Sequence, residues 1–292
     1  MKSVLIIGAS GLLGTRVARE FSSHGYQVYG SYHRNPLPPN CSPVSGEITR
    51  YSDVRSFFDR EYEVVINCAG LTNVDTCESR PEAAWQLNAT LPCWLSQLTF
   101  ESHTRFIHVS TDHFLSKLDI PRVESSKMEP VNSYGYSKLG GENVVSTYNS
   151  TAVILRTNFF GLTSRRNHSL LDFLVTEMAA ERSIIGFTDV NFSPIGASNL
   201  ARIILEISKQ NIYGLFHAAG NEILTKYDFA MKVKEVLNAQ NVHVFKGQAK
   251  ETLAQSRRPN YLALDSSKLM SSLKITPLTV DEMLTEELKY PI

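Results

Sequence analysis

The first half of the chain alternates short apolar runs with longer stretches in which apolar positions recur every three or four residues. The runs predict strands at 4–7, 27–29, 64–67, 106–109 and 152–155, because a strand buried on both faces is almost continuously apolar. The longer stretches predict helices at 12–23, 85–99 and 133–148, the second in spite of Pro92. Strands and helices alternating at these lengths indicate right-handed crossovers and a parallel sheet.

Beyond Arg156 the alternation loosens. Helices are expected at 170–180, 199–209, 226–237, 265–273 and 281–288, with a short strand at 216–218. No linker rich in proline, glycine or serine separates the two halves, so a second lobe should be built from discontinuous segments. We expect an α/β protein with a Rossmann-type, doubly wound parallel sheet over 1–157, with a later contribution from about 190–218, and a smaller C-terminal substrate lobe mainly over 158–292.

Composition narrows the classes of function. The 292 residues are 42% hydrophobic and 20% charged, which is typical of a globular protein, and basic and acidic residues balance at 29 each. A balanced charge predicts no nucleic-acid partner, and the lack of an apolar run of about 18 residues predicts no membrane span. The four cysteines (Cys41, Cys68, Cys77 and Cys93) lack metal or disulfide spacing, so we expect no metal site and free thiols in the cytoplasm.

A glycine-rich turn follows the first predicted strand. Gly8, Gly11 and Gly14 lie between that strand and the helix that begins at Leu12. Glycines at such a turn let backbone N–H groups approach a pyrophosphate at the positive end of the helix. This context favours a dinucleotide site over a tight turn that serves the fold alone.

The end of the second predicted strand bears on which dinucleotide binds. A carboxylate there would bind the ribose 2′-hydroxyl and repel a 2′-phosphate. The chain instead reads Ser31-Tyr32-His33-Arg34, without an acid. A guanidinium at Arg34, aided by His33, suits a 2′-phosphate, so NADP(H) is preferred while NAD(H) is allowed. The alternative is that Arg34 is a solvated loop residue.

Tyr134 and Lys138 are four residues apart in a predicted helix and therefore share a face. A phenol has a pKa near 10 and exchanges protons poorly at neutral pH, but a neighbouring ammonium favours the phenolate and lowers that pKa. Thr111 follows the strand at 106–109 and offers a hydroxyl to a substrate carbonyl. Such groups transfer a proton to or from oxygen while a hydride moves on carbon.

With these three segments the chain resembles the extended short-chain dehydrogenase/reductases, and among them the dTDP-4-dehydrorhamnose reductase group. The resemblance makes Thr111 the catalytic hydroxyl, Tyr134 the proton donor and Lys138 the ribose-binding lysine. It also implies contacts to the cofactor from Gly8, Ser10, Gly11, Leu12, Leu13, Gly14, His33, Arg34, Glu47, Ile48, Cys68, Ala69, Gly70, Asn88, Tyr134 and Lys138. Asn88 has an alternative role, which is to hydrogen-bond the local backbone.

The same resemblance separates related activities. The family's 4,6-dehydratases carry a glutamate where this chain has His113, so dehydration is not expected. The reductase group usually has tyrosine there, and residues 113–117 depart from its pattern. The substrate contacts implied are Thr72, Asp112, His113, Asn158, Phe159 and Arg258. Arg258 is the candidate for a substrate diphosphate, and its alternative partner is a surface carboxylate.

The activity implied is that of an NAD(P)-dependent oxidoreductase. It would use NADPH to reduce the 4-keto group of a nucleotide-linked 6-deoxyhexose, in deoxysugar or polysaccharide biosynthesis. Two alternatives remain. One is a nucleotide-sugar epimerase, and the other is a noncatalytic NADP-binding subunit resembling the regulatory subunit of methionine adenosyltransferase. A homodimer is compatible with the family, although no motif requires it.

Overall fold

The computed structural model describes residues 2–33, 35–114, 120–163, 169–249 and 256–290. The chain divides into two compact units. The first unit comprises 1–111, 130–156 and 201–216, and the second comprises 112–129, 157–200 and 217–292. Among the described residues, no helix is both long enough and apolar enough to span a membrane.

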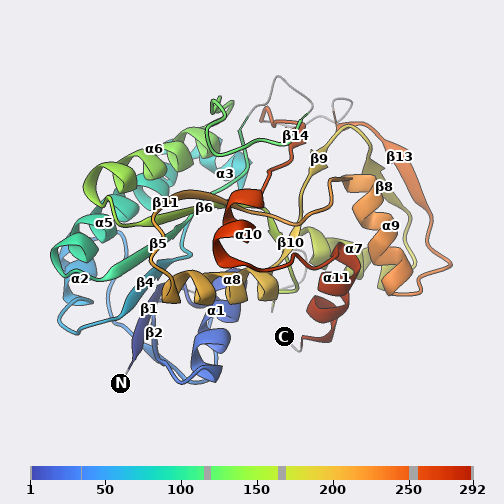
Figure 1. Cartoon of the computed structure of the whole chain (residues 1–292). Coiled ribbons are helices and arrows are strands. Elements are labelled where there is room, and N and C mark those ends of the chain that lie inside the picture. The colour runs from blue at the N-terminus through green and yellow to red at the C-terminus, as the bar shows by residue number, and fades with distance from the viewer. Residues whose placement is uncertain (1, 34, 115–119, 164–168, 250–255, 291–292) are drawn as a thin grey trace. The chain divides into compact units, whose positions relative to one another are not determined.

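A seven-stranded sheet forms the centre of the first unit (Figure 1). Its strands, in spatial order, are β11 (Gly214–Ala218), β6 (Val153–Thr157), β5 (Arg105–Val109), β4 (Val64–Asn67), β1 (Ser3–Ile7), β2 (Gln27–Gly30) and β3 (Cys41–Pro43). The pairings from β3 to β6 are all parallel. The order reverses between β1 and β4, the point at which doubly wound sheets bind ligands beyond their carboxyl ends. The expected Rossmann-type α/β fold is thus confirmed.

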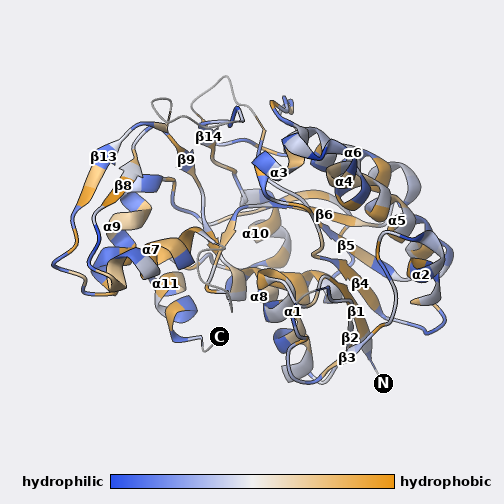
Figure 2. Cartoon of the chain, turned by 180° about the vertical axis from the view of Figure 1, so that it is seen from behind, coloured by the Kyte–Doolittle hydropathy of each residue, from blue (hydrophilic) through white to orange (hydrophobic). Residues whose placement is uncertain are grey.

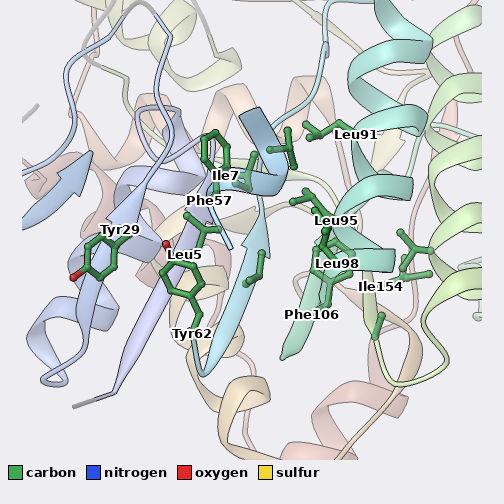
Figure 3. Packing of buried hydrophobic residues seen from close by; sticks show 14 residues of the cluster. Leu5, Ile7, Tyr29, Phe57, Tyr62, Leu91, Leu95, Leu98, Phe106 and Ile154 are labelled. Atoms are coloured by element: carbon green, nitrogen blue, oxygen red, sulfur yellow. The ribbon is translucent and has the colours of Figure 1, made fainter. Parts of the chain in front are cut away.

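Helices cover both faces of this sheet. Figure 1 shows α5 and α6 on one side and α1 on the other. The helices of this unit are α1 (Leu12–Ser23), α2 (Tyr51–Ser56), α3 (Val74–Ser79), α4 (Pro81–Trp85), α5 (Leu91–Glu101), α6 (Ser133–Tyr148) and most of α8 (Ala197–Lys209). The apolar central strands stand out in Figure 2. Figure 3 shows Leu5 and Phe106 of the strands in one cluster with Leu95 and Leu98 of α5. Burying each such side chain contributes about 1.5–3 kcal/mol.

The single helix expected over 85–99 is in fact three segments. A π-helical turn, η1 (Gln86–Thr90), separates α4 from α5, and the Leu91 N–H bonds the Gln86 carbonyl five residues back. Pro92 explains the interruption, because it lacks the N–H that would reach the carbonyl of Asn88. That carbonyl instead packs against Gly141 of α6, where a Cβ atom would lie only 2.1 Å away.

The second unit has small sheets packed with helices. Its strands are β7 (Phe159–Phe160), β8 (Ile184–Phe187), β9 (Asn191–Phe192), β10 (Ile195–Gly196), β12 (Leu224–Thr225), β13 (Val244–Gly247) and β14 (Tyr261–Leu262). Its helices include α7 (Leu170–Ala179), α9 (Lys226–Val236), α10 (Ser267–Leu273) and α11 (Val280–Lys289). Phe229 of α9 packs edge-on against Phe160 and Phe192, at ring-centroid distances of 5.1 and 5.5 Å. Most of these strands were not predicted, because two residues are too few to show an alternating pattern.

Candidate active site

The glycine turn lies at the carboxyl end of β1, beside the end of β4. Gly8 has a φ of 83°, and a Cβ atom there would lie 2.9 Å from the Ala69 nitrogen. A Cβ atom at Gly14 would lie 2.1 Å from the Gly8 carbonyl oxygen. The N-cap residue of α1 is Gly11, which has no side chain to accept a hydrogen bond from the first N–H groups of the helix. The turn therefore presents bare backbone where the sequence predicts a pyrophosphate.

Ser31, at the end of β2, holds this turn in place. Its hydroxyl accepts a hydrogen bond from the Gly8 N–H at 2.9 Å, and its carbonyl accepts one from the Ala9 N–H at 2.9 Å. His33 is exposed two residues later, at the position expected to select the cofactor. Arg34, which carries the main argument for NADP(H), lies outside the described residues.

The other predicted cofactor contacts follow the ends of β3 and β4. Glu47 and Ile48 come after β3 rather than within it; Glu47 is exposed and pairs with Arg50 at 3.4 Å. Ile48 packs against the apolar core of the first unit. After β4 come Cys68, Ala69 and Gly70, and burial raises the pKa of the Cys68 thiol to about 12, against the opposing charge of Lys138. The remaining members, Ser10, Leu12 and Leu13, belong to the glycine turn and the first turn of α1.

Asn88 is fully buried in the π-helical turn and hydrogen-bonds protein groups. Its side-chain oxygen accepts from the Leu71 N–H at 2.9 Å, and its amide donates to the Leu71 carbonyl at 2.9 Å and to Ser137 Oγ at 3.0 Å. Ser137 in turn donates to the carbonyl of Tyr134 at 2.9 Å. Asn88 thus joins the segment after β4 to α6, which supports the local-backbone interpretation of this residue.

Tyr134 and Lys138 lie one turn apart on α6 and are 9% and 5% exposed. Lys138 Nζ donates to the Val109 carbonyl at 2.7 Å, which ties α6 to the end of β5. Thr111 lies two residues beyond Val109 and is also buried. The structure thus gathers two of the three catalytic candidates on one helix and links that helix to the strand end that leads to the third.

Burial lowers the pKa of Lys138 to about 8, while Glu142 and then Cys68 act in the opposite direction. A lysine with a pKa of about 8 is mainly protonated at neutral pH and loses its proton as the pH rises above 8. The charge that would stabilise a phenolate at Tyr134 is therefore present under the conditions in which the phenol must exchange protons.

Glu78 has a definite function in the fold. One of its carboxylate oxygens accepts from the Ser133 N–H at 2.6 Å, and the other accepts from Ser133 Oγ at 3.1 Å. A carboxylate at this position favours the N-terminus of α6, the helix that carries Tyr134. Glu78 itself lies near the end of α3, so the helix that its carboxylate supports is α6 rather than its own.

In the second unit, Asp112 and Asn158 are joined directly. The Asn158 amide donates to the Asp112 carboxylate at 2.5 Å. Burial raises the pKa of Asp112 to about 6, opposed first by this bond and then by Lys226 and Arg122. The buried Arg122 guanidinium donates to the carbonyls of Asp112, Phe114 and Tyr261, so it fixes the backbone on both sides of His113.

A cavity of about 1120 Å³ lies wholly within the second unit. Its polar lining includes His113, Asn158, Lys226, Arg257 and Arg258, and its apolar lining includes Leu170, Phe173, Leu174, Ile184, Ile185 and Phe187. Burial lowers the pKa of His113 to about 4, and the charges of Arg258, Lys226 and Arg122 act in the same direction. The imidazole of His113 is therefore neutral at physiological pH, and Arg258 and Lys226 line the same cavity.

Lys226 was missed as a site residue. Its Nζ lies 3.3 Å from the centroid of the Phe192 ring, and burial lowers its pKa to about 8 while Asp112 raises it. The sequence showed it only as the first residue of the helix expected at 226–237. Arg122 was also missed; its link to the Tyr261 carbonyl spans 139 residues of the sequence.

The remaining predicted substrate contacts are more dispersed. Thr72 is exposed in the first unit, between β4 and α3. Phe159 lies in β7, where it pairs with Ile195 of β10. Of the divergent segment 113–117, residues 115–117 lie outside the described residues. Within the described residues, no group of three or more His, Cys, Asp or Glu side chains could hold a metal ion.

This chain is similar to known proteins over nearly its whole length, as three of its relatives illustrate. The probable low-salt glycan biosynthesis reductase Agl14 of Haloferax volcanii is 33% identical over 283 residues, covering 95% of this chain and 94% of the relative. The methionine adenosyltransferase 2 subunit beta of Xenopus laevis is 28% identical, covering 92% and 81%. The dTDP-4-dehydrorhamnose reductase of Mycolicibacterium smegmatis is 28% identical, covering 94% and 81%.

Solved structures agree with the fold. The dTDP-4-dehydrorhamnose reductase of Bacillus anthracis in complex with NADP superposes with a TM-score of 0.87 at 22% identity, covering 99% of each chain. The orthologue from Clostridium acetobutylicum gives a TM-score of 0.86 at 26% identity, covering 98% of each chain. The family described as the RmlD substrate binding domain matches residues 1–290. The chain therefore belongs to the RmlD substrate-binding domain family.

Proposed function

We propose that this protein is an NADPH-dependent reductase of the 4-keto group of a nucleotide-linked 6-deoxyhexose. The observation that carries the proposal is the buried pair on α6, Tyr134 and Lys138, with Lys138 bonded to the strand end that precedes Thr111. Membership of the RmlD family and the reductases among the relatives support the same activity.

The residues of the first unit fit a dinucleotide. A Cβ atom at Gly8 or Gly14 would fill the turn, and the start of α1 keeps N–H groups for a pyrophosphate. When bound, NADPH would supply the hydride that reduces the carbonyl carbon. The preference for NADPH over NADH is part of the proposal, and rests on the missing acid after β2 and on the NADP complex of the Bacillus anthracis protein.

Tyr134 would donate the proton that converts the developing alkoxide at the sugar carbon into a hydroxyl. Thr111 would donate a hydrogen bond to the same oxygen and hold the carbonyl in place. Lys138, charged below about pH 8, would favour the phenolate left on Tyr134 after the transfer. In this reaction Tyr134 would give the proton, Thr111 would hold the oxygen that receives it, and Lys138 would stabilise the charge left behind.

The cavity of the second unit would hold the nucleotide part of the substrate. Lys226 and Arg258 supply positive charge for a diphosphate, and Phe173 and Ile185 offer apolar contact area. His113, which is neutral, can donate or accept a hydrogen bond without adding charge. These features suit an anionic, partly apolar ligand, although they do not select among nucleobases.

The test is oxidation of NADPH and NADH, followed by nicotinamide absorbance, with a panel of dTDP-, GDP- and UDP-linked 4-keto-6-deoxyhexoses. We expect turnover with one sugar nucleotide, faster with NADPH, and at least about a hundredfold loss in Tyr134→Phe, as for removal of a general acid. Tyr136→Phe is the matched control, because this tyrosine is exposed on the same helix. Tight NADPH binding without turnover on any sugar would refute the proposal.

A regulatory subunit is the second candidate. It is favoured by the likeness to methionine adenosyltransferase 2 subunit beta. Under this alternative the protein would bind NADP(H), show no turnover, and co-purify with a larger catalytic partner. An epimerase would interconvert sugar nucleotides without net consumption of NADPH. A cytoplasmic location and a homodimer remain predictions, and size-exclusion chromatography with light scattering would test the homodimer.

A further inference from the structure

Three buried polar side chains follow one another along a single face of α6. Tyr134, Lys138 and Glu142 are spaced four residues apart, so each lies one turn beyond the last. The first two are the proposed proton donor and its lysine. Glu142 is 4% exposed and has no function in the reaction as described above.

Glu142 is held by two further buried residues. The Arg156 guanidinium of β6 binds it through two nitrogens, with Nη2 to Oε2 at 2.6 Å and Nε to Oε1 at 3.0 Å. Ser110 Oγ donates to Oε1 at 2.5 Å. The Ser110 N–H also donates to the Leu155 carbonyl at 2.6 Å. The carboxylate thus joins α6, β6 and the residue immediately before Thr111.

The same face of α6 is fixed to the strand end at two successive residues. Lys138 binds the carbonyl of Val109, and Glu142 binds the hydroxyl of Ser110. Thr111 is the next residue along the chain. Its backbone is therefore positioned by the helix that carries Tyr134, through two contacts that both depend on charged side chains.

Few other charged groups surround Lys138. Cys68, at the end of β4, has a pKa raised to about 12 and is a neutral thiol. His108 of β5 has a pKa held well below its usual value, first by burial and then by Lys138, so it is a neutral imidazole. Among the described groups that raise the pKa of Lys138, the carboxylate of Glu142 has the largest effect, ahead of Cys68.

We propose that Glu142 is a positioning residue of the catalytic site: fixed by Arg156, it orients Ser110 and Thr111 and keeps Lys138 charged beside Tyr134. The proposal rests on the reductase function proposed above. It explains why a charged pair that is costly to bury is placed one turn beyond the lysine, where a neutral pair would satisfy packing alone.

Two charge-neutralising variants give results of opposite sign. Glu142→Gln removes the carboxylate that raises the pKa of Lys138, so Lys138 should lose its proton more readily. We expect its acid dissociation constant to rise about tenfold, corresponding to one pH unit. Arg156→Gln removes the cation bound to that carboxylate, so the carboxylate should act more strongly on Lys138 and the pKa of Lys138 should rise above the wild-type value of about 8. A loss of packing alone would move both variants in the same direction.

The readout is the pKa of Lys138, measured by NMR on full-length protein with isotope-labelled lysine, with its signal assigned from Lys138→Met. Because this titration needs no substrate, it stays informative if no sugar is turned over. An unchanged pKa in Glu142→Gln, or shifts of the same sign in the two variants, would overturn the proposal while leaving the reductase function intact. Turnover should decline with rising pH at a lower pH in Glu142→Gln than in wild type.

A neutral pair keeps the test usable if a single variant fails to fold. Removing one partner of a buried ion pair is strongly destabilising, whereas replacing both partners is often close to neutral. In the double variant Glu142→Gln, Arg156→Gln, the pKa of Lys138 should still fall below the wild-type value, because the carboxylate is gone. Glu177→Gln is the matched control, since Glu177 pairs with Arg182 at the surface of the second unit. It should leave the titration of Lys138 unchanged.

Discussion

Replacing Asn88 by alanine should destabilise the first unit by about 3 kcal/mol. The side chain is fully buried and makes three hydrogen bonds, two to the backbone of Leu71 and one to Ser137. Each such bond contributes a net of roughly 1 kcal/mol, and a buried group left without its partner adds to the loss. Asn88 is closely packed, because a Cβ atom at Gly70 would lie 2.9 Å from its side-chain oxygen and one at Gly141 would lie 2.1 Å from its carbonyl oxygen.

Two further variants provide reference values for the loss of stability. Ser137→Ala removes one of the three hydrogen bonds to Asn88 and should cost about 1 kcal/mol. Asn73→Ala removes the N-cap of α3, an exposed side chain that accepts from the Thr76 N–H at 2.8 Å, and should also cost about 1 kcal/mol. The loss of stability on replacing the buried Asn88 is therefore expected to be roughly three times the loss on replacing the exposed Asn73.

Urea unfolding followed by tryptophan fluorescence measures these values. The chain has two tryptophans, Trp85 and Trp94, and both lie in the first unit, so the signal reports on that unit. The slope of the free energy against urea should stay constant across the series if only native stability changes. A cost for Asn88→Ala no greater than that for Asn73→Ala would refute the reasoning, and would return Asn88 to a direct role at the cofactor.

Three other predictions follow. Gly14→Ala should abolish NADPH binding, measured by fluorescence titration, because its Cβ would lie 2.1 Å from the Gly8 carbonyl; retained affinity would contradict this geometry. Lys226→Met should raise the KM for a sugar nucleotide by about ten- to a hundredfold with a smaller effect on kcat, as expected for one charged contact to phosphate, whereas exposed Lys209→Met should not. Asp112 has a folded pKa of about 6, above its unfolded value of 3.8, so its stabilising contribution is present below about pH 4 and is lost as the pH rises through 6. The free energy of unfolding, measured as a function of pH across that range, should have different slopes for wild type and Asp112→Asn. Parallel curves would contradict a pKa of about 6 for Asp112.

The sequence was sufficient for the parts of the fold that repeat a local pattern. The helices at 12–23 and 133–148 have the predicted bounds. The glycine turn and amphipathic pattern of the first, and the tyrosine and lysine spacing of the second, are each visible within a single segment. The π-helical turn before Pro92 was not predicted. Pro92 is a signal that the helix is interrupted, but the form of the interruption depends on Gly141 of another helix.

The same distinction between local and distant contacts separates the site residues that could be predicted from those that could not. Tyr134 and Lys138 could be identified because their spacing is local, and Gly8 because its turn is local. Lys226 and Arg122 could not, because their function depends on partners that the fold brings together from distant segments. The link from Glu78 to Ser133 was missed for the same reason, since 55 residues separate them.

The most direct test of the central claim follows the hydride itself. NADPH carrying deuterium at the transferable position of the nicotinamide is incubated with the preferred 4-keto-6-deoxyhexose nucleotide, and the product is examined by NMR and mass spectrometry. We expect deuterium at carbon 4 of the sugar, in one stereochemical configuration, and no transfer in a Tyr134→Phe variant that still binds NADPH. Deuterium at another carbon, or undiminished transfer in that variant, would contradict it.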